Sequence, residues 1–182
     1  MAYGVLIESM IQAKNIDALN RSVKANIDVD GGNLIALTAP TKQGDDVWTA
    51  SAPATGKLGN LWIAYNPCVK YTVVNGKKFA GLSADNRDYT NIKGEVFDAF
   101  KPVVGDEIIV TIDDVDATSA QAVAGDILES KNGQTKFTRV AGGTATSGST
   151  AFQIEWVGTV DFPKAGIGID KVKVFKAVCV QA

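Results

Sequence analysis

Short apolar runs separated by turn-forming residues recur along the whole chain. In the clearest of them, Phe152, Ile154 and Trp156 alternate with Gln153 and Glu155. Alternation of this kind is what a strand with one buried face requires. The pattern therefore predicts a strand near the C-terminus and assigns Trp156 to the protein core.

The final segment, residues 171–180, also alternates, but Phe175 and Lys176 are out of phase with the flanking valines, which predicts a bulged strand. Short runs bounded by Gly, Pro, Asn or Asp predict further strands. These strands are expected at Leu34–Thr38, Val47–Ala50, Leu61–Tyr65, Val69–Val74, Glu107–Ile112, Ile127–Glu129 and Thr135–Val140.

Two Asn-Gly dipeptides, at residues 75–76 and 132–133, each follow one apolar run, and the second lies directly between two of the expected strands. A two-residue hairpin turn of type I′ needs positive φ at both central residues, and Asn-Gly tolerates this well. Each dipeptide therefore predicts a local antiparallel hairpin. Together with the regular spacing of short strands, this indicates an all-β protein built as a single antiparallel barrel or sandwich.

Composition places few further demands on the chain. With 182 residues, of which 46% are hydrophobic, it can bury a core without help from a metal or a disulfide. The formal charge is −2 and the longest basic run is Lys77-Lys78, so nucleic acid is not an expected partner. The apolar run at the N-terminus ends at Glu8 and lacks a basic leader, and no stretch approaches the length of a membrane span, so neither secretion nor membrane insertion is expected.

The N-terminal region contains apolar residues ahead of the first clear strand. They can form one side of an extended arm that buries itself against a neighbouring subunit, or they can pack on their own domain. We expect an arm over residues 1–22, followed by a β-domain over residues 23–182. The interface candidates in the arm are Tyr3, Val5, Leu6, Ile7, Met10 and Ile11.

Sequence motifs for catalysis are missing. The chain has no histidine, which removes the usual general base, the commonest zinc ligand and the standard serine or cysteine triads. The glycine clusters at residues 31–32, 142–143 and 166–168 lack the spacing and the lysine of a phosphate-binding loop. We expect no enzymatic activity and no cofactor.

Aspartates cluster in residues 28–30 and in residues 113–116, which raises the question of a calcium site. The helix-loop-helix calcium pattern fails, because Ala39 stands at the twelfth position counted from Asp28, where a bidentate glutamate belongs. We therefore interpret both clusters as solvated turn residues.

Cys68 and Cys179 lie among apolar residues and are expected to be buried, reduced thiols. A disulfide between them would require α-carbons within about 7 Å of each other. Trp48 and Trp62 flank a Pro-Ala-Thr-Gly turn at residues 53–56 and are further interface candidates. Each can instead belong to the core, as tryptophans in β-rich domains commonly do.

The order of several turn-and-strand motifs resembles that of a group of tailed-bacteriophage head proteins. The likeness covers most of residues 23–140. Its motifs are Val23-Lys-Ala-Asn-Ile-Asp-Val-Asp-Gly-Gly-Asn-Leu-Ile-Ala-Leu37, Val47-Trp-Thr-Ala-Ser-Ala-Pro53, Leu61-Trp-Ile-Ala64, Arg87-Asp-Tyr-Thr-Asn91, Gly94-Glu-Val-Phe97, Gly105-Asp-Glu-Ile-Ile-Val-Thr111 and Gly125-Asp-Ile-Leu128.

Proteins of this group decorate or cement the outside of the capsid lattice. The resemblance implies a virion protein on the outer capsid surface that binds the major capsid protein, without catalysis, and that we expect to be a homo-oligomer. It supplies no functional residues that can be carried over to this chain. Two alternatives remain open, namely a phage tail or head-fibre component, and a carbohydrate-binding β-module that uses Trp48 or Trp62 as its platform.

Overall fold

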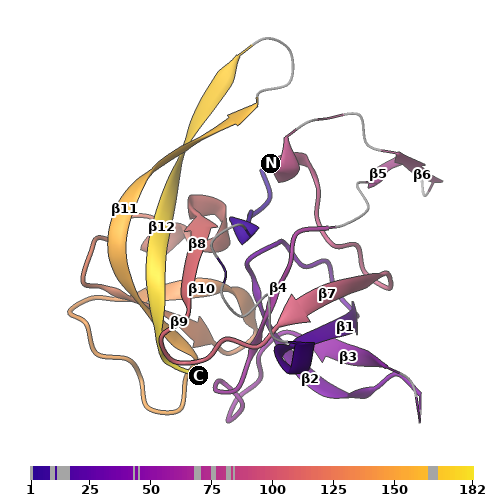
Figure 1. The fold of residues 1–182 in the computed structure, drawn as a ribbon, viewed down its shortest axis with the longest axis horizontal. Coiled ribbons are helices and arrows are strands. Elements are labelled where there is room, and N and C mark those ends of the chain that lie inside the picture. The colour runs from indigo at the N-terminus through magenta and orange to yellow at the C-terminus, as the bar shows by residue number, and fades with distance from the viewer. Residues whose placement is uncertain are drawn as a thin grey trace.

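The fold is all-β, as the sequence predicts. It consists of a closed five-stranded barrel, a second five-stranded sheet and a separate two-stranded hairpin (Figure 1). Short 3₁₀ turns are the helical elements in the part of the chain that is described, namely η3 (Asp17–Leu19), η4 (Asn86–Asp88), η5 (Ile112–Asp114) and η6 (Ala117–Ser119). This computed structural model describes residues 2–8, 11, 17–42, 44, 46–67, 71–74, 77–80, 83, 85–163 and 168–182.

The barrel closes with one parallel strand pair, which differs from the expected antiparallel arrangement. Strand β1 pairs antiparallel with β7 on one side and parallel with β3 on the other. A closed ring of five strands has an odd number of pairs, so it cannot alternate direction throughout and at least one pair must be parallel. The barrel strands, in chain order, are β1 (Asn20–Ala25), β2 (Leu34–Pro40), β3 (Val47–Ser51), β4 (Trp62–Ala64) and β7 (Val96–Phe100).

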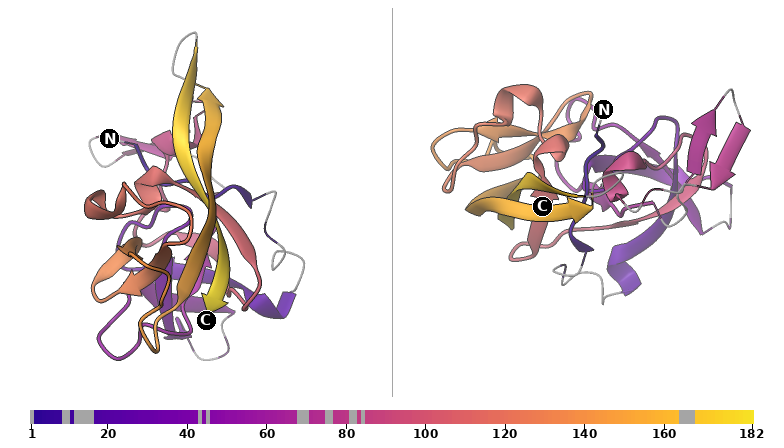
Figure 2. Two further views of the ribbon diagram at one scale, coloured as in Figure 1. Left: turned by 90° about the vertical axis from the view of Figure 1, so that its left-hand side faces the viewer. Right: turned by 90° about the horizontal axis from the view of Figure 1, so that it is seen from above.

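The second sheet is antiparallel throughout and has the strand order β10-β9-β11-β12-β8. Its two longest strands extend well beyond their neighbours, since β9 pairs with residues 151–153 of β11 and β8 pairs with residues 174–178 of β12. The rest of these two strands forms a twisted ribbon that projects from the body (Figures 1 and 2). The sheet comprises β8 (Glu107–Thr111), β9 (Ile127–Lys131), β10 (Gln134–Val140), β11 (Ala151–Pro163) and β12 (Ile169–Gln181).

Both Asn-Gly dipeptides connect paired antiparallel strands, as predicted. Strands β5 (Tyr71–Val74) and β6 (Lys77–Ala80) pair with each other, although residues 75–76 of the connection lie outside the described residues. Residues 132–133 connect β9 to β10, which confirms the second hairpin, but only Gly133 has positive φ (74°) and Asn132 does not, so this turn is not of the expected type I′.

A shared hydrophobic core joins the barrel to the second sheet. Leu34, Ile63 and Phe100 from the barrel belong to the same buried cluster as Phe152 and Phe175 from the sheet. A smaller cluster fills the other side of the barrel, and Trp48 and Trp62 pack against it while remaining half-exposed. Because the main core is common to both sheets, neither sheet buries its apolar face alone.

The assignment of Trp156 to the core is wrong, because its side chain is 49% exposed. Strand β11 carries a register shift between Ile154 and Trp156, and Glu155 has no partner residue in β12. One extra residue reverses the alternation that follows it. Phe152 and Ile154 therefore face the core, whereas two residues later Trp156 faces out.

The irregularity expected near Phe175 and Lys176 lies in the partner strand instead. Strand β12 runs in continuous register with β8 from Val174 to Val178. The change of phase arises because both faces of β12 are covered: Phe175 packs in the main core, and Val172, on the other face, packs in a small cluster with Phe162.

Candidate docking surface

Half of the interface candidates lie in residues 3–8, called here the N-terminal segment, which runs between the barrel and the second sheet (Figure 2, right). Val5 and Leu6 are fully buried, as is Ile11 beyond the segment. Tyr3 and Ile7 are half-buried, and Met10 lies outside the described residues. An N-terminal arm is therefore not confirmed, and this region packs on its own chain.

Backbone hydrogen bonds attach the N-terminal segment to the outer edge of β8. The Ile7 amide donates to the Ile109 carbonyl at 2.9 Å, and the Thr111 amide donates to the Val5 carbonyl at 3.2 Å. The segment thus acts as a short additional strand that covers an edge otherwise open to pairing.

Two carboxylates accept hydrogen bonds from the same segment. Asp30 Oδ2 accepts from the Gly4 amide at 3.3 Å, and Asp114 Oδ2 accepts from the Val5 amide at 3.1 Å and from the Thr111 hydroxyl at 3.0 Å. A Cβ at position 4 would overlap the Asp114 carboxylate, so only glycine fits there.

Asp114 is therefore not the solvated turn residue that the sequence indicated. It is fully buried beneath the N-terminal segment, and burial raises the pKa of its carboxyl well above the ordinary value. Its Oδ1 atom has no hydrogen-bond partner among the described residues. The sequence could not show this, because the cover comes from residues more than a hundred positions away.

Asn66 completes the attachment from the barrel side. Its side-chain Oδ1 accepts from the Leu6 amide at 3.0 Å and its Nδ2 donates to the Leu6 carbonyl at 2.7 Å. The Asn66 backbone amide donates to Glu8 Oε1 at 3.0 Å. A single asparagine before a proline carries no local signal of this role, so sequence reasoning did not find it.

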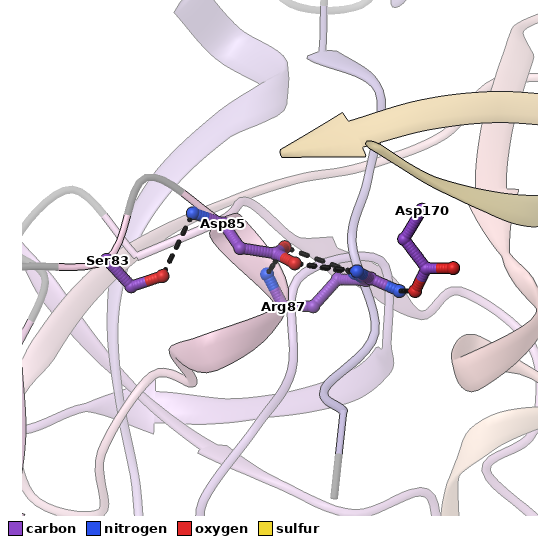
Figure 3. Close-up of polar contacts among 4 residues, drawn as sticks. All are labelled: Ser83, Asp85, Arg87 and Asp170. Carbon is purple, nitrogen blue, oxygen red and sulfur yellow. Dashed lines mark hydrogen bonds and ion pairs between the residues drawn. The ribbon is translucent and has the colours of Figure 1, made fainter. Parts of the chain in front are cut away.

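Arg87 connects the N-terminal segment to the projecting ribbon (Figure 3). Its guanidinium forms an ion pair with Asp85 at 2.6 Å and another with Asp170 of β12 at 2.8 Å. The same group lies 5.1 Å from the ring centre of Phe162 in β11, and the Arg87 carbonyl accepts from the Tyr3 amide. Its pKa is raised, chiefly by the hydrogen bonds to Asp85. The guanidinium thus ties the far end of the ribbon, where Phe162 pairs with Asp170, to residues 85–87 of the body.

Trp48 and Trp62 both lie on the barrel. The Arg21 guanidinium lies 6.0 Å from the ring centre of Trp62. Trp48 borders an open depression of about 420 Å³ that Asn20 and Asp46 also line. These two tryptophans are only half-exposed, so neither offers a free ring face comparable with that of Trp156.

Exposed valines gather beside the C-terminal end of β12. Val103 and Val104, in the turn between β7 and β8, are 46% and 63% exposed, and Val180 is 39% exposed. The backbone of this turn is joined to β12, because the Gly105 amide donates to the Cys179 carbonyl at 2.9 Å. We call Val103, Val104 and Val180 the valine patch. The sequence signal for it is the pair of valines directly before the Gly105-Asp106 turn.

The cysteines, metal-ligand groups and membrane spans considered in the sequence add no further candidate site among the described residues. Cys179 is a buried free thiol whose pKa burial raises to about 11, whereas Cys68 lies outside the described residues. Among the residues that the structure describes, no three His, Cys, Asp or Glu side chains are grouped to hold a metal ion. Within the same residues, no helix has the length and apolar character of a membrane span.

Comparison with protein-family models, with curated proteins and with solved structures finds no match to this chain.

Proposed function

We propose that this chain decorates or cements the outer surface of a tailed-bacteriophage capsid by binding the major capsid protein. The observation that carries the proposal is the ordered series of turn-and-strand motifs over residues 23–140, which resembles that of phage head proteins. In this reading the protein is a structural component of the virion, works as a homo-oligomer, and needs no cofactor and no catalytic residue.

The all-β architecture is compatible with this role. The barrel and the second sheet share one core, which makes a rigid body, and the N-terminal segment adds to that body rather than to a neighbour. A rigid body loses little conformational entropy on docking, which favours attachment to a lattice.

The valine patch is the proposed contact with the capsid. Exposed apolar residues that cluster on a surface commonly mark interaction sites. Val104 is the most exposed member, and it lies in a turn that is fixed to β12 by backbone hydrogen bonds. Three valines form a small patch, so they serve as the apolar centre of a larger contact with a polar rim.

Truncation of the first twenty residues does not test docking on its own. It would remove Val5, Leu6 and Ile11 from the protein core, and loss of binding could follow from unfolding. Charged substitutions on the exposed patch separate the two effects, because surface side chains contribute little to folding stability.

The test is co-sedimentation with capsids that lack this chain, taken from the phage that encodes it. The wild-type protein should sediment with them, and the double variant Val104→Glu, Val180→Glu should bind at least about tenfold more weakly, as expected for charges placed in an apolar contact. The matched control is Val96→Glu, at the other end of β7, where the valine is 55% exposed and opposite Lys24. This control should bind like the wild type.

Failure of the wild-type protein to sediment with capsids would refute the proposal. Assembly of the purified chain into tubes or fibres in the absence of capsids would favour a tail or fibre component instead. Equal loss of binding in the double variant and in the control would show that the valine patch is not the contact with the capsid.

A further inference from the structure

The outer face of the second sheet displays a half-exposed tryptophan, Trp156. Trp156 follows the bulge at Glu155, which turns its side chain outward, and half of that side chain is exposed. An aromatic ring of this size is costly to leave in water, because it holds a large apolar area. Its exposed area is therefore available to a ligand.

Gly158 fixes the orientation of this ring. A Cβ at position 158 would overlap the Cη2, Cζ2 and Cζ3 atoms of the Trp156 indole. These atoms belong to one side of the six-membered ring, so the ring lies across the α-carbon of Gly158 with one face towards the strand. The opposite face points to solvent. Glycine at this position lets the indole lie against the strand, and a side chain here would displace the ring.

Beside Trp156, one ammonium is ion-paired with two carboxylates, which leaves a net charge of −1 on the three groups. Lys176 is the cross-strand neighbour of Trp156, and its ammonium forms ion pairs with Glu107 at 2.8 Å and with Glu155 at 3.4 Å. The ammonium repels a cationic ligand, and the two carboxylates repel phosphate or another anion. The same groups offer both hydrogen-bond donors and acceptors to a neutral molecule.

We propose that Trp156 is a stacking platform for a neutral pyranose ring of a glycan. A pyranose has one face of C–H groups that can lie on the open indole face, and hydroxyls at its rim that can reach Glu155, Glu107 and Lys176. The assignment rests on the indole geometry and on the paired charges. It does not depend on the proposed attachment to a capsid.

The platform can be tested by titrating the ¹⁵N-labelled protein with cellohexaose, maltohexaose and chitohexaose, following the indole N–H signals by NMR. At least one of these oligosaccharides should shift the Trp156 signal with a Kd of about 1 mM, the weak range expected of a single stacking contact. Trp156→Ala should abolish that binding. Gly158→Ala, which keeps the tryptophan but displaces its ring, should weaken it at least about fivefold.

Thr159→Ala is the matched control, because Thr159 is exposed on the same strand and points to its other face. It should bind like the wild type. If none of the three oligosaccharides shifts the Trp156 signal, or if binding persists in a folded Trp156→Ala variant, the platform is refuted. The spectrum of each variant reports its folding, so loss of binding through unfolding is recognised directly.

Discussion

Replacing Leu6 with alanine tests whether the N-terminal segment is part of the folded body. Leu6 is 1% exposed and belongs to the main core, together with residues of both sheets. Replacing a buried leucine with alanine lowers the free energy of unfolding by about 2–5 kcal/mol, because transfer free energy is lost and a cavity remains. The backbone bonds of Leu6 to Asn66 persist in the variant, so the loss reports packing.

The assay is equilibrium unfolding in urea at several protein concentrations. We expect Leu6→Ala to lower the free energy of unfolding by about 2–5 kcal/mol. The control Val104→Ala, at an exposed site, should stay within about 0.5 kcal/mol of the wild type. A loss below about 1 kcal/mol for Leu6→Ala would refute the packing described here. A midpoint that rises with protein concentration in the wild type but not in Leu6→Ala would show that the segment packs on a second copy.

Three further results are expected. Arg87→Ala should lower the free energy of unfolding, measured in urea, by about 1–3 kcal/mol, because the buried Asp85 carboxylate loses the Arg87 guanidinium as its partner. Arg87→Lys should recover only part of this loss. Burial raises the pKa of the Asp114 carboxyl above 3.8, so folding favours its protonated form. The free energy of unfolding of the wild type, relative to that of Asp114→Asn, should therefore be highest below pH 3.8 and fall as pH rises through the raised pKa. A relative stability that grows with pH would contradict this. Burial raises the pKa of the Cys179 thiol to about 11. In a Cys68→Ser variant, Cys179 should therefore react with a thiol reagent at pH 8 far more slowly in the folded protein than in the unfolded protein. Equal rates would contradict the burial of Cys179.

Local patterns predicted most of the strands. The expected strands at Leu34–Thr38 and Glu107–Ile112 correspond closely to β2 and β8, and both Asn-Gly turns connect paired strands. These features depend on side-chain alternation and on turn geometry, which a short stretch of sequence contains. Strands β1 and β7 escaped prediction, and β1 begins inside the segment expected to be an arm; β6 was implied only as the partner strand of the first Asn-Gly hairpin.

Features that depend on distant partners could not be predicted. The parallel pairing of β1 with β3 follows from barrel closure, which no local pattern records. The Arg87–Asp170 ion pair joins residues 83 positions apart, and the cover over Asp114 comes from the N-terminal segment. Trp156 was misplaced because a single inserted residue, Glu155, reverses a strand's phase without leaving a clear mark in the sequence.

The central claim, attachment to a phage capsid, is tested most directly by a cryo-electron microscopy map of capsids incubated with the purified chain. We expect added density on the outer surface that fits the barrel and the second sheet, with Val103 and Val104 turned towards the major capsid protein. Capsids without added density, or density confined to the tail or its fibres, would contradict the account.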